Sequence, residues 1–139
     1  MKELEPLRLL VGSWKGSGEG PDGPFDVESE VKERGRWLLL KHAIFPPEGK
    51  EPFYLSTQVF GFDQTGLTLD YFDTAGSFKF NGKREKDQLN FEWKNGDFWK
   101  KSRYWTEDDG SISFHYQSMD ADRGGEPALS EFKGTLKPK

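Results

Sequence analysis

One short segment of the chain constrains the fold more than any other. Residues 11–20 read Val-Gly-Ser-Trp-Lys-Gly-Ser-Gly-Glu-Gly, so Trp14, Gly16 and Gly18 occupy alternate positions. In a β-strand, alternate residues point to the same face of the sheet. An indole followed by two positions without side chains is typical of a strand that bends sharply or lets another backbone approach closely. This pattern favours a sheet that curls into a barrel.

The composition indicates a folded chain whose core consists largely of aromatic rings. Although 32% of its 139 residues are charged, the chain contains 12 Phe, 5 Trp and 4 Tyr. Disordered chains are poor in aromatic residues, because these side chains drive burial. A length of 139 residues suffices for one sizeable core. We therefore expect a single domain over residues 1–139.

Charge and cysteine content exclude several kinds of site. The net charge is −4, with both signs interspersed, which disfavours binding to the backbone of a nucleic acid. Without cysteine, the chain has no disulfides, no thiolate catalysis and no cysteine-ligated metal. No continuous apolar segment resembles a signal peptide or approaches the roughly 20 residues of a membrane helix. We therefore expect a cytoplasmic protein without a membrane span.

The chain reads as one short helix followed by strands and turns. Pro6 near the start and the spacing of Leu7, Leu10 and Val11 predict a helix at about residues 3–10. Alternating apolar residues between turn residues then predict about ten strands, at residues 11–20, 25–32, 37–45, 53–62, 67–72, 77–81, 89–94, 97–106, 112–117 and 129–136. Successive hairpins of this kind form an up-and-down antiparallel meander that closes on itself. The expected fold class is an all-β barrel of about ten strands with one short N-terminal helix against it.

The opening motif resembles a known group of barrels. The segment from Leu9 to Gly20 is similar to the Gly-x-Trp-x-Gly-x-Gly-x-Gly strand of the DUF1579-like and nitrobindin-like branch of the calycin superfamily, to which lipocalins and fatty-acid-binding proteins belong. The DUF1579-like pattern is the closer one, and it continues over residues 35–40, 60–71 and 107–110. By strand rhythm the resemblance covers nearly the whole chain, but only the first motif is specific. It implies a calycin-like, lipocalin-like barrel.

The resemblance also bears on cofactors. Nitrobindin-like members bind haem through a histidine near the C-terminal end. The corresponding last strand of this chain, at residues 128–136, contains no histidine. The haem ligand therefore has no matching position, and we expect neither haem nor another cofactor.

The two histidines have different settings. His42 shares a strand face with Leu40 and Ile44, which predicts that it is buried, either as a hydrogen-bonded core residue or as a ligand contact. His115 lies opposite Phe114, which predicts that it faces solvent. Two histidines on distant strands, without a fixed carboxylate spacing, do not predict a metal site.

Arg103 is the charged residue with the most informative surroundings. It alternates with Trp99 and Trp105 on one face of its strand, while Lys100 and Tyr104 lie on the other. Facing inward, its guanidinium would bind the carboxylate of a ligand. Facing outward, it would make a cation–π contact on the barrel surface. The alternation does not decide between these two orientations.

The sequence favours binding over catalysis. It contains no Gly-x-Ser-x-Gly elbow, no phosphate loop and no His-Glu-x-x-His helix, so we name no catalytic or metal-binding residue. We predict a barrel that binds a small hydrophobic or anionic molecule. The alternatives are a structural or interaction module whose rings fill the core, and a haem-binding or enzymatic barrel. The candidate ligand-binding residues are Trp14, His42, Tyr71, Trp93, Arg103 and Tyr116.

The strand expected at residues 37–45 is apolar on both faces, through Leu38, Leu39 and Leu40. A strand that buries one face only should alternate instead. We expect its outer face to be covered by the N-terminal helix or by an identical subunit, and we favour a homodimer.

Overall fold

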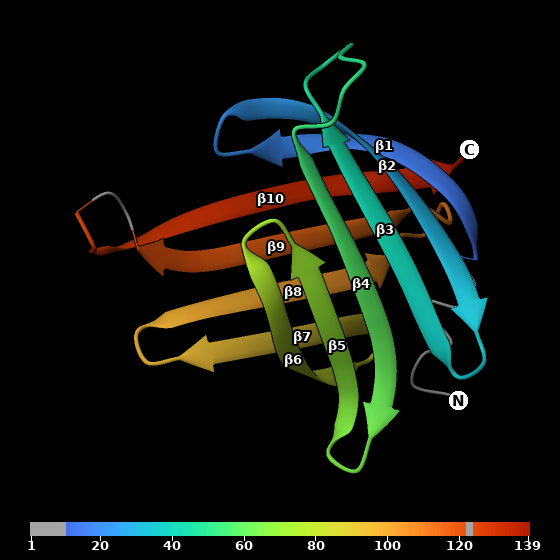
Figure 1. Ribbon diagram of the computed structural model, residues 1–139. Helices are drawn as coiled ribbons and strands as arrows, with labels where there is room; N and C mark the ends of the chain where they lie inside the picture. The colour runs from blue at the N-terminus through green and yellow to red at the C-terminus, as the bar shows by residue number, and fades with distance from the viewer. Residues whose placement is uncertain (1–10, 122–123) are drawn as a thin grey trace.

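Ten antiparallel strands follow one another around a closed barrel in the computed structural model, which describes residues 11–121 and 124–139 (Figure 1). Each strand pairs with the next one in the chain, and the first pairs with the last to close the ring. The strands are β1 (Gly12–Gly20), β2 (Gly23–Arg34), β3 (Trp37–Phe45), β4 (Tyr54–Asp63), β5 (Gly66–Asp73), β6 (Gly76–Glu85), β7 (Gln88–Asn95), β8 (Phe98–Thr106), β9 (Ile112–Ala121) and β10 (Pro127–Pro138). The predicted meander of ten strands that closes on itself is confirmed.

The fold-class prediction needs one correction. The helix expected at about residues 3–10 lies outside the described residues. Within residues 11–121 and 124–139 all regular secondary structure is strand, so no helix forms part of the described fold. Isolated helices shorter than about 12 residues are marginal because nucleation is unfavourable, and apolar spacing over eight residues is weak ground for predicting one. In the described part of the chain no helix is long and apolar enough to cross a membrane.

The glycines of β1 let the closing strands approach each other closely. A Cβ at Gly16 would lie 1.7 Å from the carbonyl oxygen of Thr135, and one at Gly18 would lie 1.9 Å from that of Lys133. Both partners belong to β10, the strand that closes the barrel against β1. The close backbone approach expected from the opening motif is therefore present at the seam.

Aromatic and aliphatic side chains fill most of the interior. Phe60 lies near the centre and makes edge-to-face contacts with Phe91 and Tyr104, at centroid distances of 5.4 and 5.6 Å. Such contacts add stability beyond the burial of the rings themselves. The largest fully buried side chains are Phe25, Phe60, Phe80, Phe91, Leu38, Leu69, Leu89, Ile112 and Val27.

The strand wall is least complete between β6 and β7. Their ladder joins residues 81–85 to residues 88–92, although β6 begins at Gly76 and β7 extends to Asn95. Phe78 and Trp93 lie beyond the ladder and contact each other edge-to-face, with centroids 5.1 Å apart. Side chains rather than backbone hydrogen bonds therefore close the wall at this point.

Exposed apolar side chains lie at two places on the outer face of β3, β4 and β5: Trp37 beside Gly61, and Leu55 with Phe72 towards the other end of these strands. Trp37 covers Gly61, where a Cβ would lie 2.1 Å from the indole, and is still 38% exposed. Leu55 and Phe72 are 54% and 45% exposed. The doubly apolar β3 thus contributes to the core on one face and exposes Trp37 on the other. The helix expected to cover the outer face of β3 lies outside the described residues, and the homodimer stays a prediction.

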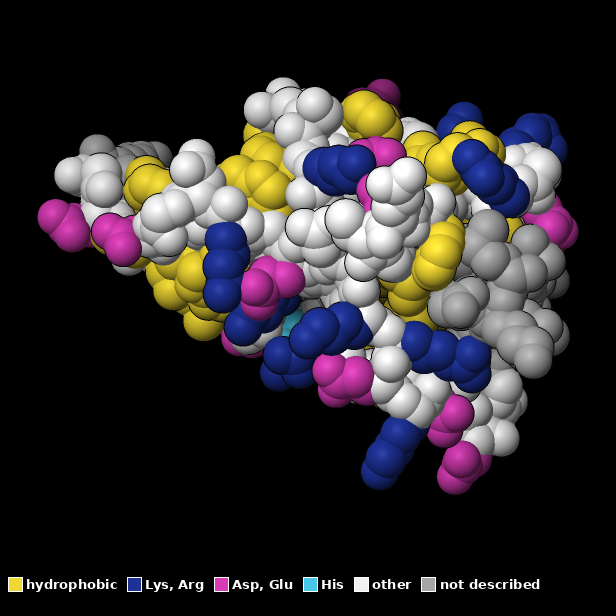
Figure 2. Space-filling view, turned by 90° about the horizontal axis from the view of Figure 1, so that it is seen from below, with side chains coloured by type: hydrophobic (Ala, Val, Ile, Leu, Met, Phe, Trp, Pro, Cys, Tyr) yellow, Lys and Arg dark blue, Asp and Glu magenta, His cyan; other side chains and the backbone are white. Residues whose placement is uncertain are grey.

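Charges of both signs alternate over the surface. Figure 2 shows Lys and Arg side chains beside Asp and Glu on the face seen from below. Examples of such pairs are Lys32 with Glu30 at 2.9 Å and Lys94 with Glu92 at 3.1 Å. Exposed pairs of this kind contribute little to stability, so the strand pairing and the core carry the fold.

Candidate functional site

A small cavity lies inside the barrel, and hydrogen-bonding groups line it together with rings. Its volume is about 30 Å³, which holds about two water molecules. The lining comes from β3, β4 and β5 on one side and from β8, β9 and β10 on the other. Its polar side chains include His42, Tyr54, Ser56, Gln58, Tyr71, Ser102, Tyr104 and Tyr116.

Gln58 and Tyr104 join opposite walls of this cavity. The Tyr104 phenol donates a hydrogen bond of 2.5 Å to Oε1 of Gln58. The Gln58 amide in turn donates to the hydroxyl of Ser56 at 3.3 Å. Burial raises the pKa of the Tyr104 phenol, so this hydroxyl keeps its proton and remains a donor.

His42 lies beside this pair and has two aromatic neighbours. Its Nδ1 is 2.7 Å from the hydroxyl of Ser29, and its ring centroid lies 6.5 Å from Tyr104 and 5.3 Å from Phe114. Burial lowers the pKa of the imidazole to about 4. The ring is therefore neutral near pH 7 and offers one donor and one acceptor.

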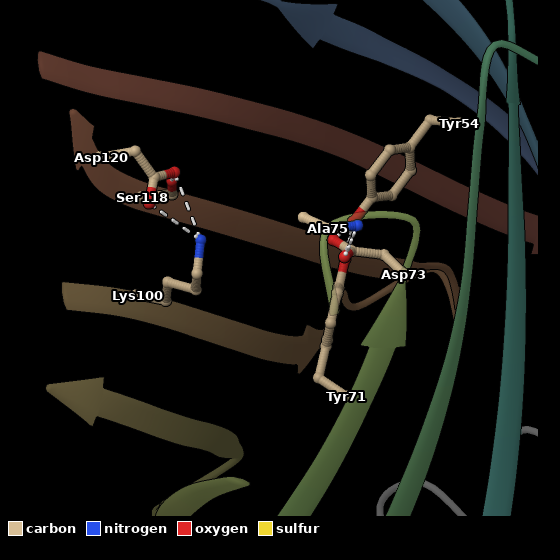
Figure 3. Close-up of polar contacts among 7 residues, drawn as sticks. All are labelled: Tyr54, Tyr71, Asp73, Ala75, Lys100, Ser118 and Asp120. Carbon is tan, nitrogen blue, oxygen red and sulfur yellow. Dashed lines mark hydrogen bonds and ion pairs between the residues drawn. The ribbon is translucent and has the colours of Figure 1, made fainter. Parts of the chain in front are cut away.

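Tyr54, Tyr71 and Asp73 form a second polar cluster (Figure 3). Tyr54 donates a hydrogen bond of 2.9 Å to Oδ2 of Asp73, and it is also bonded to the hydroxyl of Tyr71. Because the Tyr54 proton goes to the carboxylate, Tyr71 is the donor in the bond between the phenols. Asp73 is held in place by the backbone N–H of Ala75, which donates to Oδ1 at 2.8 Å. Burial raises the pKa of Tyr71 to about 12, so both phenols are protonated.

Three half-buried rings, which we call the mouth rings, lie between the cavity and solvent: Tyr54, Tyr116 and Phe132. Tyr54 stacks on Phe132 at 6.1 Å, and Tyr116 lies 6.5 Å from the same ring. Tyr116 also stacks on Tyr71 at 5.5 Å. The mouth rings therefore connect the surface to the polar cluster around Tyr71.

Lys100 is a buried cation beside the incomplete wall between β6 and β7. Its Nζ lies 3.1 and 3.2 Å from the two carboxylate oxygens of Asp120, which also accept a hydrogen bond from Ser118 (Figure 3). The ammonium lies 4.7 Å from the ring centroid of Phe78 and 6.0 Å from that of Trp93. The Lys100 side chain is 9% exposed, whereas that of Asp120 is 53% exposed.

Five of the six candidate ligand-binding residues face the interior. His42, Tyr71 and Tyr116 line the cavity. Trp93 lies next to Lys100 rather than in the cavity lining. Trp14 is buried in the main hydrophobic cluster, where it is 6% exposed. The structure thus brings three of the predicted residues together and leaves Trp14 and Trp93 in separate places.

Arg103 does not line the cavity, because it faces outward from β8. In register it lies between Asn90 of β7 and His115 of β9. Its two neighbours along the strand, Ser102 and Tyr104, point inward and are 3% and 4% exposed. Of the two orientations considered from the sequence, the structure has the outer one.

The histidines lie on different sides of the barrel wall. His42 is inside, whereas the His115 side chain alternates with the inward Phe114 and Tyr116 and reaches Glu131, with its Nε2 3.7 Å from a carboxylate oxygen, although His115 also borders the cavity. Burial, and then the nearby charge of Lys133, lowers the pKa of His115. Across residues 11–121 and 124–139, no three His, Cys, Asp or Glu side chains gather in a way that could hold a metal ion.

Several polar residues of the interior were not among the candidates from sequence: Tyr54, Gln58, Lys100 and Tyr104. The sequence does indicate the residues of β4, because residues 54–60 read Tyr-x-Ser-x-Gln-x-Phe. The three polar residues of this pattern lie on the same strand face as Phe60, which is buried. Lys100 and Tyr104 likewise occupy the row of β8 opposite Arg103. Recognising that row as the inner one would have found both residues.

Comparison with known proteins supports the fold. No family model matches the chain, and no curated protein matches it. Among solved structures, the crystal structure of Rv2717c from M. tuberculosis is similar, with a TM-score of 0.71 and 16% sequence identity. The match covers 100% of this chain and 98% of that one. At this identity the likeness shows the barrel fold alone, and the DUF1579-like and calycin-like resemblance stays a prediction.

Proposed function

We propose that this barrel binds a small, largely apolar molecule whose polar group enters the cavity between Gln58 and His42. The observation that supports this is the concentration of hydrogen-bonding side chains around an interior cavity. Burying polar groups in a core lowers stability unless each is well hydrogen-bonded. A barrel interior that serves stability alone is better built from apolar side chains, as most of the rest of this core is.

The groups around the cavity have capacity for a ligand. Among the described contacts, His42 uses Nδ1 toward Ser29, which leaves Nε2 for a further hydrogen bond. The carbonyl oxygen of Gln58 accepts one hydrogen bond from Tyr104 and has a second lone pair. A hydroxyl or amide on a flat ligand would find a donor and an acceptor there, with aromatic faces around its apolar part.

The size of the cavity determines how such a ligand is admitted. Pockets for drug-sized ligands are typically about 300–1,000 Å³, far more than the cavity of about 30 Å³ in this barrel. A ligand of one or two rings fits when the mouth rings rotate outward. Tyr54, Tyr116 and Phe132 are each half-buried, so their rotation leaves the fully buried core in place.

A second candidate function is an interaction module with a filled core. The small cavity volume and the exposed apolar side chains on the outer face, Trp37, Leu55 and Phe72, favour it. This alternative requires no small-molecule binding inside the barrel. One experiment therefore separates the two.

The test is a fluorescence titration with naphthol, which is neutral, flat and carries one hydroxyl. Ser56→Leu fills the cavity, while Thr57→Leu places the same side chain on the outer face of the same strand. We expect the wild type and Thr57→Leu to bind alike, and Ser56→Leu to bind at least about tenfold more weakly, a loss of about 1.4 kcal/mol. Equal affinity of the two variants, or no binding by the wild type, would overturn the proposal in favour of the interaction module.

A further inference from the structure

We infer that Lys100 is the anion-recognition point of this barrel, and that Asp120 holds the position taken by the carboxylate of a hydrophobic acid when one binds. The inference rests on the proposed function and names the ligand class for it. That class is a small hydrophobic molecule that carries one negatively charged group for Lys100 in addition to the polar group that enters the cavity.

The first argument is the unequal burial of the two partners. The Lys100 side chain is 9% exposed and the Asp120 side chain 53% exposed, although Nζ lies 3.1 Å from Oδ1. A lysine is rarely buried to this extent unless it has a charged partner. Here that partner lies at the end of β9 and is half in water. To turn into solvent, Asp120 gives up its bonds to Lys100 and Ser118, and the ammonium that stays inside then needs another anion.

The second argument is the setting of the ammonium. It faces the ring of Phe78 at 4.7 Å and that of Trp93 at 6.0 Å. These rings offer apolar surface to the body of a ligand, and their cation–π attraction stabilises the ammonium while the two carboxylates exchange. Both rings lie where β6 and β7 have stopped pairing with each other, while Phe78 still pairs with Tyr71 of β5 and Trp93 with Lys100 of β8. Their side chains can therefore shift while the backbone stays in place.

The third argument is the distance to the proposed ligand cavity along the strands. Lys100 pairs in register with Ser118, and the next inward pair is Ser102 with Tyr116, which both line the cavity. An anionic group bound to Lys100 therefore lies one inward-facing residue along β8 from the lining of the cavity. A flat apolar body attached to it would pass along Tyr116, one of the mouth rings.

The experiment compares naphthoate with naphthamide, which has the same rings without the charge, by isothermal titration calorimetry. The proteins are the wild type, Asp120→Asn, Lys100→Met and Lys101→Met. Lys101 is the next residue of β8 and faces outward, so its variant removes the same charge from the other side of the wall. Thermal melting of each variant confirms that it is folded.

We expect Asp120→Asn to bind naphthoate about tenfold more tightly, because the competing carboxylate is gone. Lys100→Met should lose about tenfold or more, because the anion then lacks its buried partner. Lys101→Met should match the wild type. Naphthamide should bind all four proteins within about twofold, since a neutral group does not depend on the ion pair.

The inference is overturned if Asp120→Asn leaves naphthoate affinity unchanged, if naphthoate binds neither this variant nor the wild type, or if Lys101→Met loses as much affinity as Lys100→Met. The Asp120→Asn arm decides on its own if Lys100→Met fails to fold. Failure of the proposed function gives a different result. The neutral probes then do not bind the wild type, while Lys100-dependent binding of naphthoate would still support the inference.

Discussion

Tyr104 and Gln58 are 46 positions apart in the chain and are joined by a hydrogen bond of 2.5 Å across the inside of the barrel. Their strands, β8 and β4, are not neighbours in the sheet. Both side chains are almost fully buried, at 4% and 2% exposure. Backbone hydrogen bonds of a barrel connect only adjacent strands, so a bond of this kind fixes how far apart opposite walls lie. It therefore sets the shape of the cavity.

Removing the Tyr104 hydroxyl should destabilise the protein. In Tyr104→Phe the carbonyl of Gln58 loses its donor while it stays buried, which typically costs about 1–3 kcal/mol. Adding Gln58→Leu removes the unpaired acceptor and should recover part of this loss. Urea unfolding of both single variants and the double variant measures the coupling. If the stability losses of the two single variants simply add up in the double variant, the hydrogen bond contributes nothing beyond the two side chains themselves.

A side chain at Gly16 should prevent close pairing at the barrel seam. In Gly16→Ala the new Cβ would lie 1.7 Å from the Thr135 carbonyl oxygen, so β1 and β10 must separate. We expect a loss of about 3 kcal/mol or more, the upper range for overpacking. Ser17→Ala, on the exposed face of the same strand, should change stability by less than about 0.5 kcal/mol. Chemical denaturation measures both, and similar values would contradict a tight seam.

Acid should destabilise the fold through His42. Burial lowers the pKa of this ring from 6.5 to about 4, so between these values the unfolded state takes up a proton that the folded state does not. The contribution of His42 is therefore complete above pH 6.5 and decreases as the pH falls towards 4, by up to about 1.4 kcal/mol per pH unit. The pKa of His115 is also lowered, so the wild type must be compared with a variant.

His42→Gln is that variant, because it keeps a polar side chain beside Ser29 without an imidazole to titrate. The free energy of unfolding should depend less steeply on pH in His42→Gln than in the wild type over this window. Urea unfolding at a series of pH values measures the two slopes. Identical slopes would mean that His42 is not the group responsible.

The positions of the strands could be predicted from the sequence, whereas the orientation of their side chains often could not. The strand expected at residues 37–45 is β3 with the same bounds, and that at 97–106 is β8, Phe98–Thr106. Turn residues and apolar alternation are local, so they are visible in one sequence. In β8, however, Tyr104 and Trp105 put an aromatic ring on each face. The alternation then shows that the segment is a strand, but it does not show which of the two strand faces lies inside the barrel.

The contacts that make the candidate site depend on closure of the barrel. Whether Lys100 or Arg103 faces inward follows from how β8 pairs with β7 and β9, and that register is set by the whole ring of strands. The partner of Lys100 is Asp120, which the sequence places in the polar region after the core of β9. No local pattern connects the two residues. The sequence therefore predicted His42, Tyr71 and Tyr116 in the interior but missed the buried cation.

The Lys100–Asp120 pair should matter little for stability if its role is recognition. Lys100→Met fills the space of the lysine stem and leaves a carboxylate that is already 53% exposed, so we expect stability to change by less than about 1 kcal/mol or to rise. Asp120→Ala leaves the buried ammonium without its carboxylate and should cost about 3 kcal/mol.

Urea unfolding of both variants and of the double variant measures this difference. In the double variant the loss should largely disappear, since no buried charge is left unpaired. A loss in Lys100→Met as large as that in Asp120→Ala would indicate instead that the pair stabilises the fold, which would explain the buried lysine without a ligand.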